Sequence, residues 1–236
     1  MTTDAHPQGP VAVIGTTTWG TTLALVMARR GIEVRLLART AGEADTLTAA
    51  GENPRLKGMA FPDTLSVTDD WANSLDDAAA VLFVVPSQTL RENARRARPY
   101  LGRAPMVICA TKGIEQGSGQ RMSELLAEEI PEIAAQMGVL SGPNLAREVV
   151  RDLPTSTVIA SADDAVARRA QALLNSQTFR VYTNSDVIGV ELGGALKNVI
   201  AIGAGVIDGL GLGDNAKAGF LTRGLAEMMR LGVAAG

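Results

Sequence analysis

The stretch VAVIGTTTWG, residues 11–20, decides the fold that the sequence predicts. The apolar run at 11–14 is typical of a buried strand. It ends at Gly15, and a helical pattern begins near Trp19. A strand, a glycine turn and a helix start open a dinucleotide-binding unit when a second strand follows within ~30 residues, and residues 33–38 supply that strand. The first free N–H groups of the helix then face a pyrophosphate.

Position 17 departs from the usual glycine spacing of this loop. The pattern would put glycines at 15, 17 and 20, but the middle position is Thr17. Its branched side chain occupies space where backbone normally approaches the phosphate. We therefore expect a cofactor loop that is weakened but still works. On these ten residues alone, a plain strand–turn–helix without a ligand is the alternative.

Apolar runs alternate with helical patterns through most of the chain. The expected strands are 11–15, 33–38, 64–68, 80–86, 105–110, 137–141, 155–160 and 178–182. The expected helices between them are 19–30, 41–50, 88–98, 119–129 and 164–175. This alternation predicts an α/β fold, a Rossmann-like doubly wound sheet with parallel strands.

The character of the sequence changes after residue 185. Residues 186–207 are long, apolar and rich in small side chains, which predicts a buried helix, and a second helix follows at 214–232. A membrane span is the alternative, but charged Glu191 and Lys197 sit mid-segment, where lipid penalises charge. We expect a flexible leader at 1–9, a Rossmann-like domain at 10–185 and a helical substrate domain at 186–236. We expect that helical domain to be truncated, because the sequence stops within it.

Composition limits the partners and the chemistry. The 236 residues carry a formal net charge of −3, which gives no reason to expect nucleic acid or an anionic membrane as partner. The lone cysteine, Cys109, lies in an apolar run and indicates a reducing, cytoplasmic setting. The one histidine, His6, lies in the leader, so chemistry in the folded part must proceed without histidine.

Lysines and one arginine are the candidate functional residues. Three polar loops, 84–90, 110–119 and 140–148, follow expected strands and should meet at the carboxyl edge of the sheet, where Lys112 could bind an anion. Lys197 shares a helical face with small and polar residues. A buried lysine without a carboxylate tends to a lowered pKa, which suits proton transfer, although snorkelling at a domain seam is the alternative.

The end of the second strand bears on the choice of cofactor. An NAD site usually places an acid there, whereas this sequence has Arg39, which suits a 2′-phosphate. A solvated surface arginine is the alternative. The pattern favours NADP(H) and leaves NAD(H) possible.

Four stretches carry a family resemblance: TKGIE at 111–115, SGPNLAREV at 141–149, FRVYTNSDVIGVELGGALKNVIAIGAG at 179–205 and LTRGLAEMMRLG at 221–232. From about residue 10 onward the chain resembles the bacterial-type NAD(P)-dependent glycerol-3-phosphate dehydrogenases. The resemblance implies an oxidoreductase that reversibly reduces dihydroxyacetone phosphate to sn-glycerol 3-phosphate for glycerophospholipid synthesis. It also implies a small phosphate substrate, no metal, and a homodimer in the full-length form.

The resemblance assigns roles by position. It implies that Lys197 transfers the proton. It implies cofactor contacts at Gly15, Thr18, Trp19, Gly20, Arg39, Lys112 and Ala146, and substrate contacts at Lys112, Gly142, Asn144, Lys197 and Asn198. It further implies a downstream Asp and an Arg-Asn pair that this sequence does not contain. Another NADP-dependent hydroxyacid or sugar-phosphate dehydrogenase, or an inactive cofactor-binding remnant, therefore remains an alternative.

Overall fold

A computed structural model describes residues 9–102 and 105–236, so nearly all of the expected leader, with His6, lies outside the described residues. Its centre is an eight-stranded sheet with the order β3-β2-β1-β4-β5-β6-β7-β8. The strands are β1 Val11–Ile14, β2 Val34–Leu37, β3 Leu65–Thr68, β4 Ala80–Phe83, β5 Met106–Cys109, β6 Met137–Ser141, β7 Thr155–Ala160 and β8 Phe179–Asn184. Every expected strand is confirmed, with ends shifted by a few residues.

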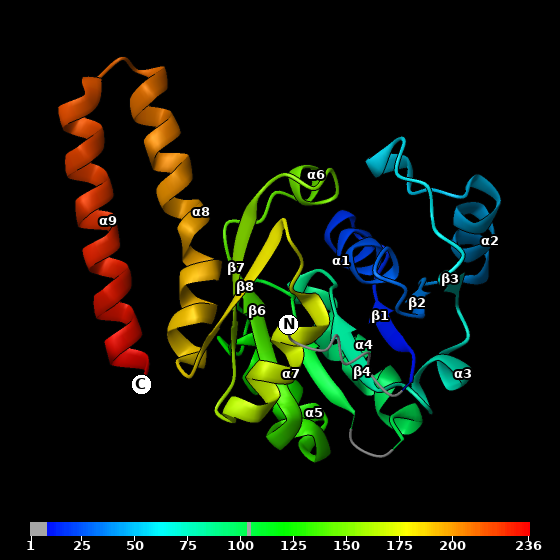
Figure 1. The fold of residues 1–236 in the computed structure, drawn as a ribbon. Coiled ribbons are helices and arrows are strands. Elements are labelled where there is room, and N and C mark those ends of the chain that lie inside the picture. Colours follow the sequence, from blue (N-terminus) through cyan, green and yellow to red (C-terminus); the bar gives the residue numbers. More distant parts are fainter. Residues whose placement is uncertain (1–8, 103–104) are drawn as a thin grey trace.

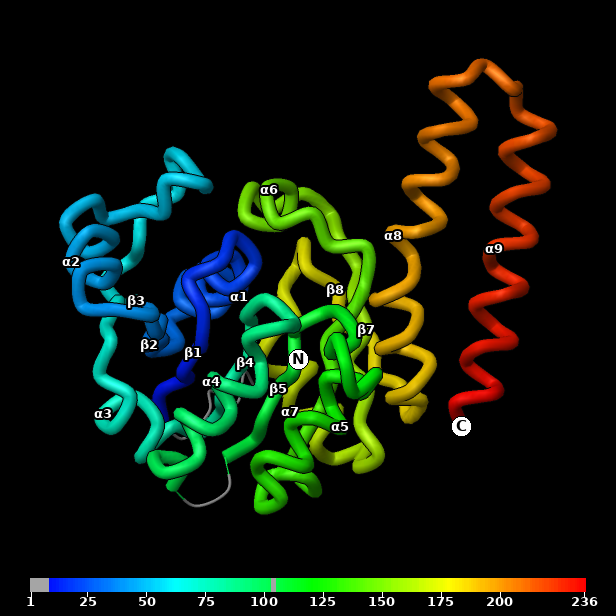
Figure 2. Tube along the Cα trace, turned by 180° about the vertical axis from the view of Figure 1, so that it is seen from behind, coloured from blue at the N-terminus to red at the C-terminus, as the bar shows by residue number. Residues whose placement is uncertain are grey.

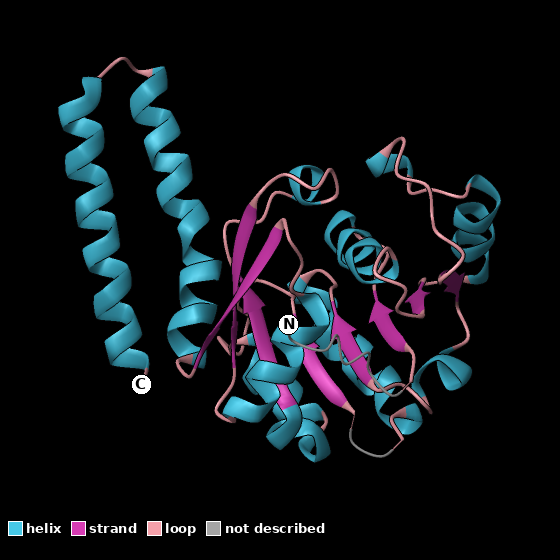
Figure 3. Cartoon of the chain, viewed as in Figure 1, coloured by secondary structure: helices cyan, strands magenta, loops and turns pink. Residues whose placement is uncertain are grey.

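Helices join the strands and cover both faces of the sheet (Figures 1 and 3). They are α1 Thr18–Ala28, α2 Ala41–Ala50, α3 Trp71–Leu75, α4 Leu90–Ala97, α5 Met122–Glu129, α6 Ala146–Val149, α7 Asp164–Leu174, α8 Val187–Gly209 and α9 Gly213–Ala235. Short 3-10 turns lie at η1 Pro54–Leu56, η2 Ser87–Thr89, η3 Arg98–Tyr100 and η4 Pro131–Gln136. The brief helices α3 and α6 were not expected from the sequence, because neither is long enough to show a helical period.

Alternate residues of each strand feed two separate cores. Val11 and Val13 of β1 pack with α1 and α7 on one face, whereas Ala12 and Ile14 pack with α4 and α5 on the other. Figure 2 shows the same layers from behind. Because both faces are covered, the central strands read as continuous apolar runs. Burial of these two cores fixes the order of the strands and therefore which loops meet at each edge.

The expectation of an all-parallel sheet is wrong at one position. All neighbouring pairs run parallel except β6 and β7, which pair antiparallel, with Leu140 opposite Ile159. A parallel return needs a crossover of a dozen or more residues, usually with a full helix. The connection from β6 to β7, residues 142–154, is long enough, but its helix α6 has only one turn and does not cross back over the sheet, so the chain reverses direction instead.

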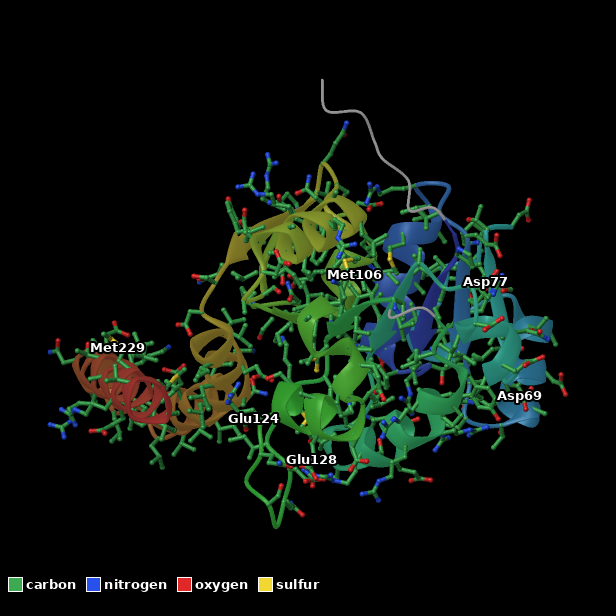
Figure 4. The ribbon with its side chains drawn as sticks, turned by 90° about the horizontal axis from the view of Figure 1, so that it is seen from below. Asp69, Asp77, Met106, Glu124, Glu128 and Met229 are labelled. Atoms are coloured by element: carbon green, nitrogen blue, oxygen red, sulfur yellow. The ribbon has the colours of Figure 1, made fainter. Side chains whose placement is uncertain are left out.

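Helices α8 and α9 form a hairpin beside the sheet, and the expectation that the first of them is buried is also wrong. The buried residues of α8 are Glu191, Leu192 and Gly194, all in its first half. Figure 4 shows that α9, which carries Met229, is the helix of the hairpin farther from the sheet domain. Glu124 of α5 lies on the side of the sheet domain that faces the hairpin. Many apolar side chains are exposed along the pair, including Val199, Ile202, Val206, Leu210, Leu225, Met229 and Val233.

By length and composition alone, α8 is apolar enough to cross a membrane. Its first turns nevertheless pack on β6 and β7, and α9 lies along its full length. Those protein contacts favour a helix of the folded protein over a lipid-embedded span.

One buried carboxylate ties α8 to the sheet domain. Glu191 Oε1 accepts a hydrogen bond from the Ser123 backbone N–H at 2.8 Å, and Oε2 accepts from Ser123 Oγ at 2.6 Å. Arg121 Nη1 adds an ion pair at 2.5 Å. Glu191 is only 8% exposed, so these partners compensate the cost of burying its charge.

This clamp predicts a large stability difference between two neighbouring carboxylates. Glu191→Ala should lower the free energy of unfolding by about 2–3 kcal/mol, because it leaves buried donors of α5 without a partner. Glu124→Ala removes the other, more exposed partner of Arg121 and should cost less than about 1 kcal/mol. Urea denaturation of both variants measures the difference, and equal losses would contradict the clamp.

Candidate active site

A cleft of about 780 Å³ opens at the carboxyl ends of β1, β2 and β4. The chain leaves β1 for β2 on one side and later returns to β4 on the other, so the cleft lies where the strand order reverses. Ligands of open α/β sheets bind at such switch points. Residues from the loop after β1, the end of β2, η1 and α4 line the cleft, among them Gly15, Thr16, Thr17, Arg39, Glu43, Pro54, Arg55, Trp71 and Arg96.

The loop after β1 is rigidly held, and Thr17 is part of the reason. Gly15 has φ +114°, a conformation that favours glycine, and it makes the turn out of the strand. Thr17 is the N-cap of α1: its Oγ1 accepts from the Gly20 N–H at 3.0 Å and donates to Val84 O at 2.9 Å. The expectation that Thr17 only weakens the loop is therefore incomplete, because its hydroxyl joins α1 to the end of β4.

The end of β2 carries Arg39 into the same cleft. Its side chain is 83% exposed, and its Nε pairs with Glu43 Oε2 at 3.2 Å. Arg96 reaches the same end from α4, stacks 4.4 Å from the centre of the Trp71 ring, and donates from Nη1 to Arg39 O at 3.4 Å. Two guanidinium groups therefore lie at the end of the cleft that adjoins the carboxyl end of β2.

The three polar loops converge at the carboxyl edge of β4, β5 and β6, as expected. Lys112 Nζ donates to Gly142 O at 2.8 Å, joining the loops after β5 and β6. Gln88, after β4, donates to Ile114 O at 3.0 Å and accepts from the Gln116 N–H at 2.9 Å. Burial, with the nearby charge of Lys197, lowers the pKa of Lys112 to about 8.

Lys197 approaches this edge from α8. Gly194 makes the approach possible, because a Cβ there would lie 2.1 Å from Ser141 Oγ of β6. Lys197 is half-buried rather than buried, and its Nζ donates to Asn198 Oδ1 at 3.2 Å. Among the described residues neither Lys112 nor Lys197 pairs with a carboxylate. The arrangement offers two ammonium groups to an anionic ligand.

Other residues expected in the site have side chains that pack or form hydrogen bonds within the protein. The Trp19 indole packs edge-on against Phe179, with ring centres 6.2 Å apart, and does not line the cleft. Thr18 and Gly20 also stay out of the lining. Asn144 uses its amide on β7, donating to Ser156 O and accepting from Thr157 Oγ1. Ala146 O accepts from Thr22 Oγ1 at 3.4 Å, which keeps α6 beside α1.

Sequence reasoning missed several polar residues that shape the cleft. Buried Asn53 donates to Thr16 O at 3.1 Å and to Thr21 Oγ1 at 2.8 Å, so it supports the loop after β1. Glu43 folds back to the end of β2, where Oε2 accepts from the Arg39 N–H. The stretch T-A-G-E at 40–43 resembles a capping-box pattern and could have indicated the position of this carboxylate. Nothing in the sequence around Asn53 indicates its role beyond the Asn-Pro that starts η1.

The switch-point cleft and the glycine turn into α1 define a Rossmann-like fold, the class in which dinucleotide sites lie at this position. The comparisons narrow this class. The protein-family model described as the NAD-dependent glycerol-3-phosphate dehydrogenase N-terminus matches residues 10–167 of the sequence. The family model of the C-terminus matches residues 186–236. The chain belongs to the NAD-dependent glycerol-3-phosphate dehydrogenase family.

Individual relatives agree with this assignment. The glycerol-3-phosphate dehydrogenase [NAD(P)+] of Rhodospirillum rubrum is 52% identical over 96% of this chain and 64% of the relative. That of Dehalococcoides mccartyi is 47% identical over the same shares. The crystal structure of the Coxiella burnetii glycerol-3-phosphate dehydrogenase superposes with a TM-score of 0.88 at 41% identity, covering 97% of this chain and 70% of that one. The chain thus spans less than two thirds of the length of the first two relatives.

The two hydrogen bonds of the Thr17 hydroxyl predict that two substitutions at this position differ in their free energy of unfolding. Thr17→Val keeps the shape but removes the hydroxyl, so it should lower the free energy of unfolding by about 1 kcal/mol, the usual value of an N-cap. Thr17→Ser keeps the hydroxyl and should stay within about 0.5 kcal/mol of the wild type. Thermal or urea unfolding of the pair measures this. Equal stability of the two variants would show that the hydroxyl contributes nothing.

Proposed function

We propose that this chain reduces dihydroxyacetone phosphate to sn-glycerol 3-phosphate, reversibly, with a nicotinamide cofactor. The observation that carries the proposal is the meeting of Lys112 and Lys197 at the carboxyl edge of the sheet without a carboxylate partner. Two ammonium groups suit a substrate with a phosphate dianion and a carbonyl oxygen that becomes negative during reduction. The names of the relatives support this reaction over that of another hydroxyacid or sugar-phosphate dehydrogenase.

The residues fit a dinucleotide cofactor. The cleft is of the size that small-molecule sites require, and the loop that leads into the N-terminus of α1, Gly15 to Thr17, lines it. When bound, NAD(P)H supplies the hydride that reduces the carbonyl carbon. We propose the contacts implied by the resemblance, with the loop around Gly15 near the pyrophosphate and Ala146 beside α1. Because Trp19 packs into the core, its proposed contact is made by backbone.

The protein's own contribution to the reaction is charge and a proton. In the proposed mechanism Lys197 donates a proton to the developing alkoxide oxygen, and Asn198 orients its ammonium group. Lys112, held by Gly142 O, stabilises negative charge on the phosphate or the alkoxide. Gly142 and Asn144 then border the substrate through the loop after β6. No histidine is needed for these steps.

The exposed guanidinium of Arg39 supports a preference for NADP(H) over NAD(H), because a free fork of N–H donors suits a 2′-phosphate. Equal affinities of the unmutated chain for the two cofactors would contradict that preference.

Three further expectations stay proposals. We propose a domain boundary at residues 185–186, between β8 and α8. Buried Cys109 supports a cytoplasmic setting. We propose that the protein forms a homodimer, and light scattering measures its mass in solution.

Turnover of a Lys197 variant tests the reaction. Lys197→Ala should lower kcat by roughly 10²–10⁴-fold, the usual range for a lost proton donor. Its affinity for NADPH should stay within about threefold of the wild type, since the cofactor cleft keeps its lining. Steady-state kinetics and isothermal titration measure the two quantities. Unchanged turnover would remove Lys197 from the mechanism, and a wild type that binds cofactor without turnover would support the inactive remnant.

The lowered pKa of Lys112 predicts the pH dependence of substrate binding. The ammonium form, which attracts the phosphate, is lost as pH rises through about 8. The affinity for dihydroxyacetone phosphate should therefore fall roughly tenfold between about pH 7.5 and about pH 9. Lys112→Arg stays charged throughout this range and should flatten the profile. Isothermal titration across pH tests this, and parallel profiles for the two proteins would contradict it.

A further inference from the structure

The structure brings an acid to the end of β2 that the strand itself lacks. Glu43, in the first turn of α2, lines the cofactor cleft beside Arg39. Its Oε2 accepts from the Arg39 backbone N–H at 3.1 Å and from Arg39 Nε at 3.2 Å. Its Oε1 accepts from Thr16 Oγ1, in the loop after β1, at 2.7 Å. The carboxylate therefore bridges the strand end and the phosphate loop.

This carboxylate stays charged at neutral pH. Burial raises the pKa of Glu43, but the hydrogen bonds from Thr16 and Arg39 outweigh burial and bring the net pKa below the ordinary value. The side chain is 26% exposed, so the charge is only partly screened by water.

We propose that Glu43 is a specificity-determining residue of the cofactor site, which opposes a 2′-phosphate and accepts a hydrogen bond from the ribose hydroxyl of NAD(H). The inference rests on the proposed function, because it assumes that a dinucleotide occupies this cleft. NAD sites use an acid at the end of the second strand for this contact. Here the acid, Glu43, comes from α2 and lies beside Arg39, which favours NADP(H) instead.

The two preferences are physically coupled. Glu43 engages Nε of Arg39 and leaves the two terminal nitrogens free, so Arg39 can still meet a 2′-phosphate. Arg96, stacked on Trp71, adds a second positive charge at this end of the cleft. Glu43 thus limits a preference for NADP(H) that the two guanidinium groups would otherwise make strong.

Cofactor titrations of matched variants test the inference on the 236-residue chain. Glu43→Gln keeps the length and one acceptor oxygen but removes the charge. It should raise the ratio of NADH to NADPH dissociation constants about five- to tenfold. Asp45→Asn removes the same charge from an exposed position of α2 outside the cleft lining and should leave the ratio within about twofold. Arg39→Ala should move the ratio in the opposite direction to Glu43→Gln.

The outcomes separate this inference from the proposed function. A wild type that binds neither cofactor overturns both. A wild type that binds cofactor, with an unchanged ratio in Glu43→Gln or equal shifts in Glu43→Gln and Asp45→Asn, overturns the role of Glu43 alone. Circular dichroism melting verifies the fold of each variant. Glu43→Ala, which should shift the ratio in the same direction, serves if the glutamine variant does not fold.

Discussion

The buried carboxylate of Glu191 is the contact on which the geometry of the site depends. It takes hydrogen bonds from Ser123 and an ion pair from Arg121, both at the start of α5, and so fixes the first turns of α8 against the sheet domain. The rest of α8 and α9 is largely exposed. Lys197 lies six residues further along, less than two helical turns away. The position of the proposed proton donor is therefore set by this polar clamp together with Val187, Val190 and Leu192, which pack the first turns of α8 against the sheet domain.

A second polar network holds the loop after β5, which carries Lys112. Arg91 of α4 donates to both oxygens of Glu115, at 2.8 Å each, and also pairs with Glu128 and Glu129 of α5. These hydrogen bonds lower the pKa of Glu115 to about 2, so the network persists at any physiological pH. Glu115 lies three residues after Lys112. Ion pairs thus join α5 both to α8, which carries Lys197, and, through Arg91, to the loop that carries Lys112.

The sequence predicted best those features that hydrophobic periodicity and glycine turn signals indicate. The strands, the glycine turn at Gly15 and the lysine within an apolar helix all stand out against their surroundings. The direction of β7 was not predicted, because it depends on how short the helix in the preceding connection is. The exposure of α8 was not predicted either, since an apolar composition does not tell which surface will cover a helix. Glu43 and Asn53 read as ordinary polar residues, because their partners lie in other elements and are brought together only by the sheet.

The loop after β1 illustrates how such contacts alter the meaning of a motif. This chain has threonines at positions 16 and 17, the second in place of the glycine of the pattern. Their hydroxyls reach Glu43 and Val84, while Asn53 donates to the carbonyl of Thr16. Links to α2, β4 and the η1 loop thus converge on two residues, Thr16 and Thr17. A loop fixed in this way loses less conformational freedom when a ligand binds. The side chain at position 17 occupies space that a glycine would leave open, but its hydroxyl fixes the loop to α1 and to the end of β4, so the missing glycine marks a loop that is built differently from the usual pattern.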